Sequence, residues 1–183
     1  AAGKPVTVLS MGEHDTRTDL SILTSMDASA KGGNTGYSPV VGFESLRRAV
    51  AERIERQTGV PTGPENVIIV PGGQAALCAS HHAVCDPGDT ALFIDPYYAT
   101  YPGTIRAVGA LPRAVMAHAD NDFQPLRADL EAAAKGAKSL LINSPNNPTG
   151  AVYSEQTMHD IADVCQGNDL WLISDEVYDT QVW

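Results

Sequence analysis

Residues 139–150 read SLLINSPNNPTG, an apolar run that passes directly into a turn with three asparagines, two prolines and a glycine. The apolar run is typical of a buried β-strand, and the prolines indicate a rigid turn at its carboxyl end. A second apolar run, LWLI at 170–173, leads into Ser174, Asp175 and Glu176. Ligands of open α/β sheets gather beyond the carboxyl ends of the strands, so the two stretches together indicate a binding site.

Short apolar runs alternate with longer amphipathic patterns along the whole chain. We expect strands within 6–12, 66–73, 89–96, 111–117, 138–145 and 170–176, and helices within 42–59, 74–85, 126–136 and 154–167. This alternation predicts an α/β fold with a mostly parallel sheet flanked by helices. The chain ends eight residues after Asp175 without a closing helix, so we expect the domain to be incomplete at its C-terminal end.

Composition narrows the class of protein. The 183 residues are 43% hydrophobic and 19% charged, which fits one globular domain with a core. The net charge is −10 and the 12 basic residues are dispersed, so we expect no nucleic-acid partner. No apolar run has the length of a membrane span, and we expect no membrane partner. The three cysteines match no metal spacing, and reduced thiols favour a cytoplasmic location.

Further candidate sites follow other predicted strands, and each allows two interpretations. Residues 71–74, PGGQ, suit either a phosphate at a helix N-terminus or a tight strand-to-helix turn. Residues 96–101, PYYATY, either cap the core or offer a flat face to an aromatic ligand. Asp175 either stabilises a protonated heterocyclic nitrogen or serves as a cap or paired carboxylate.

Taken together and in this order, these stretches resemble the class I/II aminotransferases, which are fold-type-I pyridoxal-phosphate enzymes. The strongest elements are NPTG at 147–150 and SDEVY at 174–178, and the resemblance covers essentially the whole chain. It implies the large domain of an aminotransferase with pyridoxal 5'-phosphate as cofactor. It also implies an amino acid and a 2-oxo acid as substrates, and a homodimer.

The resemblance implies a cofactor-binding set made of Gly73, Gln74, Tyr98, Asn147, Asp175 and Tyr178. The amides and side chains around Gly73 and Gln74 would hold the cofactor phosphate, and Tyr98 would stack on the pyridine ring. These roles are implied by the family and not by the spacing of the residues.

The resemblance also assigns the polar contacts of the pyridine ring. Asn147 and Tyr178 would hydrogen-bond the 3-hydroxyl oxygen, and Asn147 would also face the substrate. Asp175 would act as a catalytic residue by pairing with the protonated ring nitrogen, which keeps the ring an electron sink. The family implies a cis peptide bond at Asn147-Pro148.

Two further roles fall near the N-terminus. Tyr37, in a stretch similar to the family's interface-crossing segment, would reach the phosphate of the partner's cofactor and is a second candidate catalytic residue. Gly12 would border the substrate carboxylate. We therefore expect residues 1–36 to lead into the substrate mouth and dimer interface, and residues 37–183 to form a truncated pyridoxal-phosphate domain.

Some elements of the family are missing from the sequence. Its lysines are Lys4, Lys31, Lys135 and Lys138, and none has the Ser-x-x-Lys context of the family's Schiff-base lysine. The family's carboxylate-binding arginine is also missing. We therefore expect the chain to be the N-terminal half of an aminotransferase and inactive alone. Another pyridoxal-phosphate enzyme, such as a C–S lyase, or a non-catalytic cofactor-binding module remains an alternative.

Overall fold

A computed structural model describes residue 7, residue 12 and residues 16–182. The chain divides into two compact units, residues 1–64 and residues 65–183. The functional division predicted at 36/37 differs from this division by compactness and stays a prediction. Most of the strand predicted within 6–12 lies outside the described residues.

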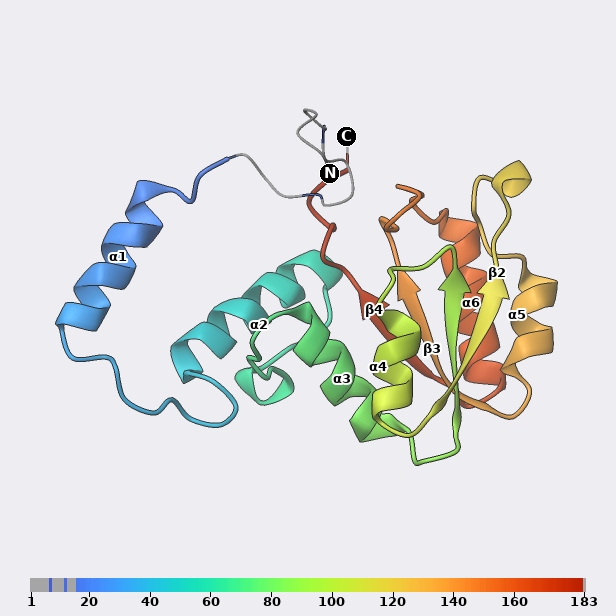
Figure 1. The fold of residues 1–183 in the computed structure, drawn as a ribbon, viewed down its shortest axis with the longest axis horizontal. Helices are drawn as coiled ribbons and strands as arrows, with labels where there is room; N and C mark the ends of the chain where they lie inside the picture. Colours follow the sequence, from blue (N-terminus) through green and yellow to red (C-terminus); the bar gives the residue numbers. More distant parts are fainter. Residues whose placement is uncertain (1–6, 8–11, 13–15, 183) are drawn as a thin grey trace, which may run out of the picture. The chain divides into compact units, whose positions relative to one another are not determined.

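Residues 65–183 form an α/β unit around a parallel sheet (Figure 1). Within the described residues the sheet has four strands in the order β2-β1-β3-β4. They are β1 (Thr90–Asp95), β2 (Leu111–Met116), β3 (Ala137–Asn143) and β4 (Trp171–Asp175). The predicted parallel α/β fold is confirmed, and these four strands fall where the apolar runs placed them.

Helices cover both faces of the sheet, as parallel strands require. They are α3 (Gly73–Val84), α4 (Tyr101–Ala107), α5 (Arg127–Ala134) and α6 (Glu155–Gly167). Side chains alternate along β1, so that Leu92 and Ile94 join the core under α5 and α6. Ala91 and Phe93 point to the opposite core, under α3 and α4. The two layers of buried side chains fix the strand ends that carry polar residues.

The strand predicted within 66–73 is wrong. Residues 67–70 carry the apolar sequence of a strand but form no regular element, and Ile68 is 66% exposed. A strand exists through hydrogen bonds to a neighbour, and this run pairs with none of the sheet strands in the described part of the chain. The apolar composition of residues 67–70 favours a strand, but the segment forms none because it has no partner strand in the described part of the chain.

The sequence analysis missed two helices and two short 3₁₀ helices, η1 (Pro64–Asn66) and η2 (Ala119–Asn121). Helix α4 has seven residues and includes Pro102 and Gly103, which hide its periodicity. Helix α1 (Leu20–Lys31) begins at Asp19, whose side chain accepts a 2.8 Å hydrogen bond from the amide of Ser21. It has no buried residues, although its sequence includes the apolar residues Leu20, Leu23 and Met26.

Residues 16–64 contain helix α1 and helix α2 (Glu44–Thr58), which was predicted within 42–59 and ends at Gly59 with a φ of 72°. The apolar face of α2 is partly uncovered, because Phe43 and Leu46 are exposed whereas Val50 and Ile54 are half-buried. Phe43 and Leu46 are 56% and 47% exposed, and Ala51 is the buried residue of the helix. No helix among the described residues combines the length and apolar character needed to cross a bilayer.

Candidate functional site

The site lies at the carboxyl edge of the sheet, between β1 and β3. From β1 the chain moves outward to β2, and from β3 it moves outward to β4, so the strand order reverses between these two central strands. Loops that leave such a point in opposite directions open a crevice for a ligand. The side-chain amide of Asn146 donates a 3.2 Å hydrogen bond to the carbonyl oxygen of Pro96, which ties the two loops together.

Asn146 also holds the turn after β3 in one shape. It is 7% exposed, and its Oδ1 accepts hydrogen bonds from the amide and hydroxyl of Thr149 at 3.2 and 2.8 Å. Its main chain donates to the carbonyl of Ala151 and accepts from the amide of Gly150, which has a φ of 74°. The first of the paired asparagines is therefore structural.

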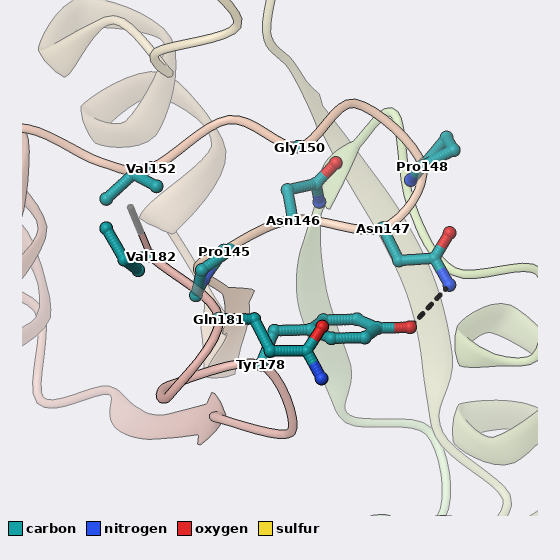
Figure 2. A pocket seen from close by; sticks show the side chains of 9 residues that line it. All are labelled: Pro145, Asn146, Asn147, Pro148, Gly150, Val152, Tyr178, Gln181 and Val182. Carbon is teal, nitrogen blue, oxygen red and sulfur yellow. Dashed lines mark hydrogen bonds between the residues drawn. The ribbon is translucent and has the colours of Figure 1, made fainter. Parts of the chain in front are cut away.

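The second asparagine, Asn147, carries the polar group of the turn. The Asn147-Pro148 peptide bond is cis, as predicted. The Asn147 side chain is half-buried, and its Nδ2 lies 3.3 Å from the hydroxyl oxygen of Tyr178 (Figure 2). Two of the predicted cofactor-binding residues thus present an amide and a hydroxyl group at one place.

Asn143, the last residue of β3, joins this turn to the end of β4. It is 2% exposed and lies opposite Asp175 in the register of the two strands. Its Nδ2 donates to the carbonyl oxygen of Asp175 at 2.9 Å, and its Oδ1 accepts the amide of Asn147 at 2.8 Å. One buried side chain therefore sets the distance between the predicted ring acid and the predicted ring-oxygen donor.

The carboxylate of Asp175 is half-buried and has a partner on each oxygen. Oδ2 accepts a 2.8 Å hydrogen bond from the hydroxyl of Tyr101, and Oδ1 accepts the amide of Val177 at 3.3 Å. Tyr101 is 2% exposed. Burial raises the pKa of Tyr101 well above its ordinary value, and the hydrogen bond and charge of Asp175 raise it further. Tyr101 therefore remains a donor at neutral pH.

The tyrosine-rich stretch after β1 combines both roles considered for it. Tyr101 is in the core, and the ring of Tyr97 packs edge-on against Phe93 with centroids 4.8 Å apart. Tyr98 is 42% exposed, and its ring meets that of Tyr101 at 75° with centroids 5.8 Å apart. The exposed ring is the one predicted to stack on an aromatic ligand.

The turn before α3 provides open main chain at a helix N-terminus. Gly72 has a φ of 87°, a conformation that side chains other than that of glycine disfavour. A β-carbon added at Gly72 or Gly73 would meet nothing within 4 Å. The amides of a first helical turn have no carbonyl partner within the helix, so this turn suits an anion.

The side chain of Gln74 is already engaged. The hydroxyl of Thr100 donates to Gln74 Oε1 at 2.7 Å, and Gln74 Nε2 donates to the hydroxyl of Thr104. The prediction that amides and side chains around Gly73 and Gln74 hold a phosphate stays a prediction. The side chain of Gln74 ties the start of α3 to α4.

A cavity of about 480 Å³ borders the Asn147–Tyr178 pair. It is lined by Pro145, Asn146, Asn147, Pro148, Gly150, Val152, Tyr178, Gln181 and Val182 (Figure 2). The amide and hydroxyl groups lie toward one end in Figure 2, and Val152 and Val182 lie toward the other. The cavity thus offers hydrogen-bonding groups beside an apolar wall. The described residues hold no cluster of side chains that could bind a metal ion.

Hydrogen bonds and ring contacts link most of the predicted site residues within residues 65–183. Asn147 bonds Tyr178 directly, Asn143 connects Asn147 to Asp175, and Tyr101 connects Asp175 to Tyr98. The side chain of Gln74 forms its hydrogen bonds with Thr100 and Thr104 instead. Tyr37 and Gly12 belong to residues 1–64, where both are exposed. The roles predicted for these two residues stay predictions.

Sequence reasoning missed the residues that connect the site. Asn143 was part of the opening motif but had no role of its own, although a polar residue ending a buried strand is a signal in itself. Tyr101 was counted among three tyrosines without a partner. Its bond to Asp175 joins residues 74 positions apart, and no local pattern shows such a contact.

Comparison with known proteins identifies the family. The sequence profile described as Aminotransferase class I and II matches residues 4–183. The chain is 34% identical over 182 residues to a probable aspartate/prephenate aminotransferase of Thermus aquaticus, covering 99% of this chain and 48% of that protein. It is 34% identical to an arginine–pyruvate transaminase of Pseudomonas aeruginosa, covering 96% of this chain and 45% of that protein.

Solved structures agree with the sequence relatives. The aspartate aminotransferase of Thermus thermophilus with maleate has a TM-score of 0.91 and 34% identity, over 96% of this chain and 46% of that one. The aspartate aminotransferase of Thermotoga maritima has a TM-score of 0.94 and 31% identity, over 98% and 48%. The chain spans about half the length of the curated relatives it matches. It belongs to the class I and II aminotransferase family.

Proposed function

We propose that the intact protein is a pyridoxal-phosphate-dependent aminotransferase that moves an amino group between an amino acid and a 2-oxo acid. The observation that carries the proposal is the pair of hydrogen bonds made by Asn143. They hold the carboxylate-bearing residue Asp175 and the amide-bearing residue Asn147 at one edge of the sheet. A protonated pyridine ring with an oxygen beside it needs an acid and a donor arranged in this way.

The residues present fit pyridoxal phosphate. The open first turn of α3 at Gly73 suits the phosphate group, because a β-carbon there would meet nothing within 4 Å. The exposed ring of Tyr98 suits the flat face of the pyridine. When bound, the cofactor serves as the electron sink for the substrate's α-carbon.

Each polar side chain then has a distinct task. Asp175 would accept a hydrogen bond from the protonated ring nitrogen, and its charge would favour the protonated ring. Asn147 and Tyr178, whose polar groups lie 3.3 Å apart, would donate to the ring oxygen and orient the ring. Asn143 is buried and fixes the spacing of the other groups through its two hydrogen bonds.

The remaining features of the proposal concern the whole protein. The lysine and arginine that the family uses would lie outside the 183 residues, so the activity is proposed for the intact protein. We propose that it is a homodimer in which Tyr37 reaches the partner's cofactor and Gly12 borders the substrate.

The three cysteines, all free, support a cytoplasmic location. The named relatives act on different amino acids, so the proposal extends to the substrate class alone.

The test is transamination by the intact protein with pyridoxal phosphate and a panel of amino acids. Asp175→Ala should lower kcat/KM by about 100-fold or more, because the ring nitrogen loses its counter-charge. Far-UV circular dichroism and Tm should stay close to the wild-type values. Glu176→Gln is the matched control, since the neighbouring Glu176 bonds Ser174 and not the cofactor elements.

Near-native activity of Asp175→Ala would contradict the proposal. The alternatives give different outcomes. A C–S lyase would turn over without an added 2-oxo acid and keep the cofactor as pyridoxal phosphate, whereas an aminotransferase would need the 2-oxo acid to regenerate pyridoxal phosphate. A non-catalytic binding module would hold the cofactor in a complex that borohydride does not trap.

A further inference from the structure

Tyr101 is held rigidly at the start of α4, beneath the proposed cofactor site. Its ring is 2% exposed and belongs to the core cluster that contains Phe93, Ile105 and Leu141. The ring cannot turn without displacing these neighbours, because protein cores are close-packed. The position of its hydroxyl is therefore set by the core and not by the solvent.

This hydroxyl reaches across from α4 to the end of β4. It donates a 2.8 Å hydrogen bond to Oδ2 of Asp175. The other carboxylate oxygen, Oδ1, accepts the amide of Val177 at the longer distance of 3.3 Å. A carboxylate has about four acceptor positions, so Asp175 keeps capacity for a further donor after both bonds are made.

We propose that Tyr101 is a positioning residue, which orients the carboxylate of Asp175 toward the ring nitrogen of the cofactor. The inference rests on the proposed function and adds a residue for which the sequence analysis had no role. Burial raises the pKa of Tyr101, so the hydroxyl keeps its proton at neutral pH and serves as a hydrogen-bond donor to Asp175.

The bond also places the acid in one rotamer. A carboxylate with a single fixed donor turns freely about the remaining axis, whereas donors on both oxygens restrict it. Tyr101 begins α4 and Val177 lies in the turn directly after β4, so the carboxylate is held between these two segments. A substitution that removes the hydroxyl alone should loosen the acid without emptying the core.

The test measures cofactor affinity in the intact apoprotein with two ligands. One is pyridoxal phosphate, and the other is its deaza analogue, in which a carbon–hydrogen unit replaces the ring nitrogen. Tyr101→Phe should weaken pyridoxal phosphate about ten-fold, the loss typical of a hydrogen bond to a charged group, and leave the analogue's Kd unchanged. Tyr97→Phe, which removes a hydroxyl from the same segment, should change neither Kd.

A double variant tests whether Tyr101 affects cofactor affinity through Asp175. In an Asp175→Asn background, Tyr101→Phe should cause no further change in the ratio of the two Kd values. Equal weakening of both ligands by Tyr101→Phe would overturn the inference, because it would indicate a structural role. An unchanged ratio in Tyr101→Phe would overturn it as well.

The proposed function fails separately. If the wild-type apoprotein does not bind pyridoxal phosphate, the function itself is wrong. The same holds if Asp175→Asn leaves the ratio of the two Kd values unchanged. A ratio that responds to Asp175→Asn but not to Tyr101→Phe would leave the function standing and remove Tyr101 from it.

Discussion

Residues 65–183 and residues 16–64 use their apolar side chains in different ways. In the first region both faces of the sheet carry buried clusters, and Leu92, Leu140 and Ile161 are fully buried. In the second region α1 buries no residue, and Leu20 is 76% exposed. Both regions have amphipathic helices, but a helix is stabilised by what covers its apolar face. Helix formation and core formation are therefore separate properties of this chain.

The largest difference between the regions should appear in large-to-small substitutions. Leu140→Ala leaves a cavity in a fully buried position and should lower the free energy of unfolding of the intact protein by about 2–5 kcal/mol. Leu20→Ala is the matched substitution on α1 and should change it by less than about 0.5 kcal/mol. Urea denaturation measures both. Equal losses would break the comparison, since they would mean that α1 is covered in the intact protein.

A smaller difference is expected for asparagine substitutions. Asn143→Ala leaves the carbonyl of Asp175 and the amide of Asn147 without their partner and should cost about 1–3 kcal/mol. Asn34→Ala removes an exposed bond to Ser29 and should cost less than about 0.5 kcal/mol. Thermal unfolding of the two variants side by side provides the measurement. The comparison would be wrong if the Asn34 variant lost as much stability as the Asn143 variant.

Helix caps give a third pair. Ser154 caps α6 by accepting the amide of Thr157 at 3.1 Å, and α6 buries four residues against the sheet. Ser154→Ala should lower the free energy of unfolding by about 1 kcal/mol. Asp19→Ala removes the cap of α1, whose unfolding is not coupled to a buried face. We expect this second variant to leave the main urea transition unmoved, and a shift of that transition would count against the difference between the regions.

The last prediction concerns His81 and the pH dependence of the free energy of unfolding. This side chain is fully buried, and neither ring nitrogen has a hydrogen-bond partner among the described residues. Burial lowers its pKa below the ordinary value of 6.5, because desolvation disfavours the charged ring. In the pH range between the ordinary pKa of 6.5, which applies to the unfolded state, and the lowered pKa of the folded state, the unfolded state binds more protons. The free energy of unfolding therefore falls as the pH falls from 6.5 through the lowered pKa.

The variant His81→Leu should therefore lose less stability than the wild type when the pH is lowered from 7 to 5. His82→Gln, at the adjacent exposed position, is the control and should keep the wild-type slope. Denaturation midpoints at several pH values give the slopes. Identical slopes for the wild type and His81→Leu would show that His81 is not linked to folding.

The sequence predicted the sheet and much of the site for identifiable reasons. Strands β1, β2, β3 and β4 follow from apolar runs, and α6 from its serine cap and periodicity. The run at 67–70 has the same composition but no partner strand, so composition misled there. Pairing is a property of two segments, and a pattern within one segment does not reveal it.

The site shows the same limit. Asn147, Asp175 and Tyr178 were proposed from the family motifs, and hydrogen bonds connect them. Asn143 and Tyr101, which make those connections or fix the acid, depend on strand register and helix packing. The sequence alone shows which groups the site has, whereas tertiary contacts show what holds them.

The bond between Asn143 and the end of β4 has a consequence for how this site can change. Asn143 donates to the main-chain carbonyl of residue 175 and not to its carboxylate. Every residue type has that carbonyl, so the tie survives any substitution of the side chain. The side chain at position 175 can therefore change while the hydrogen bond that holds the end of β4 to Asn143 is kept.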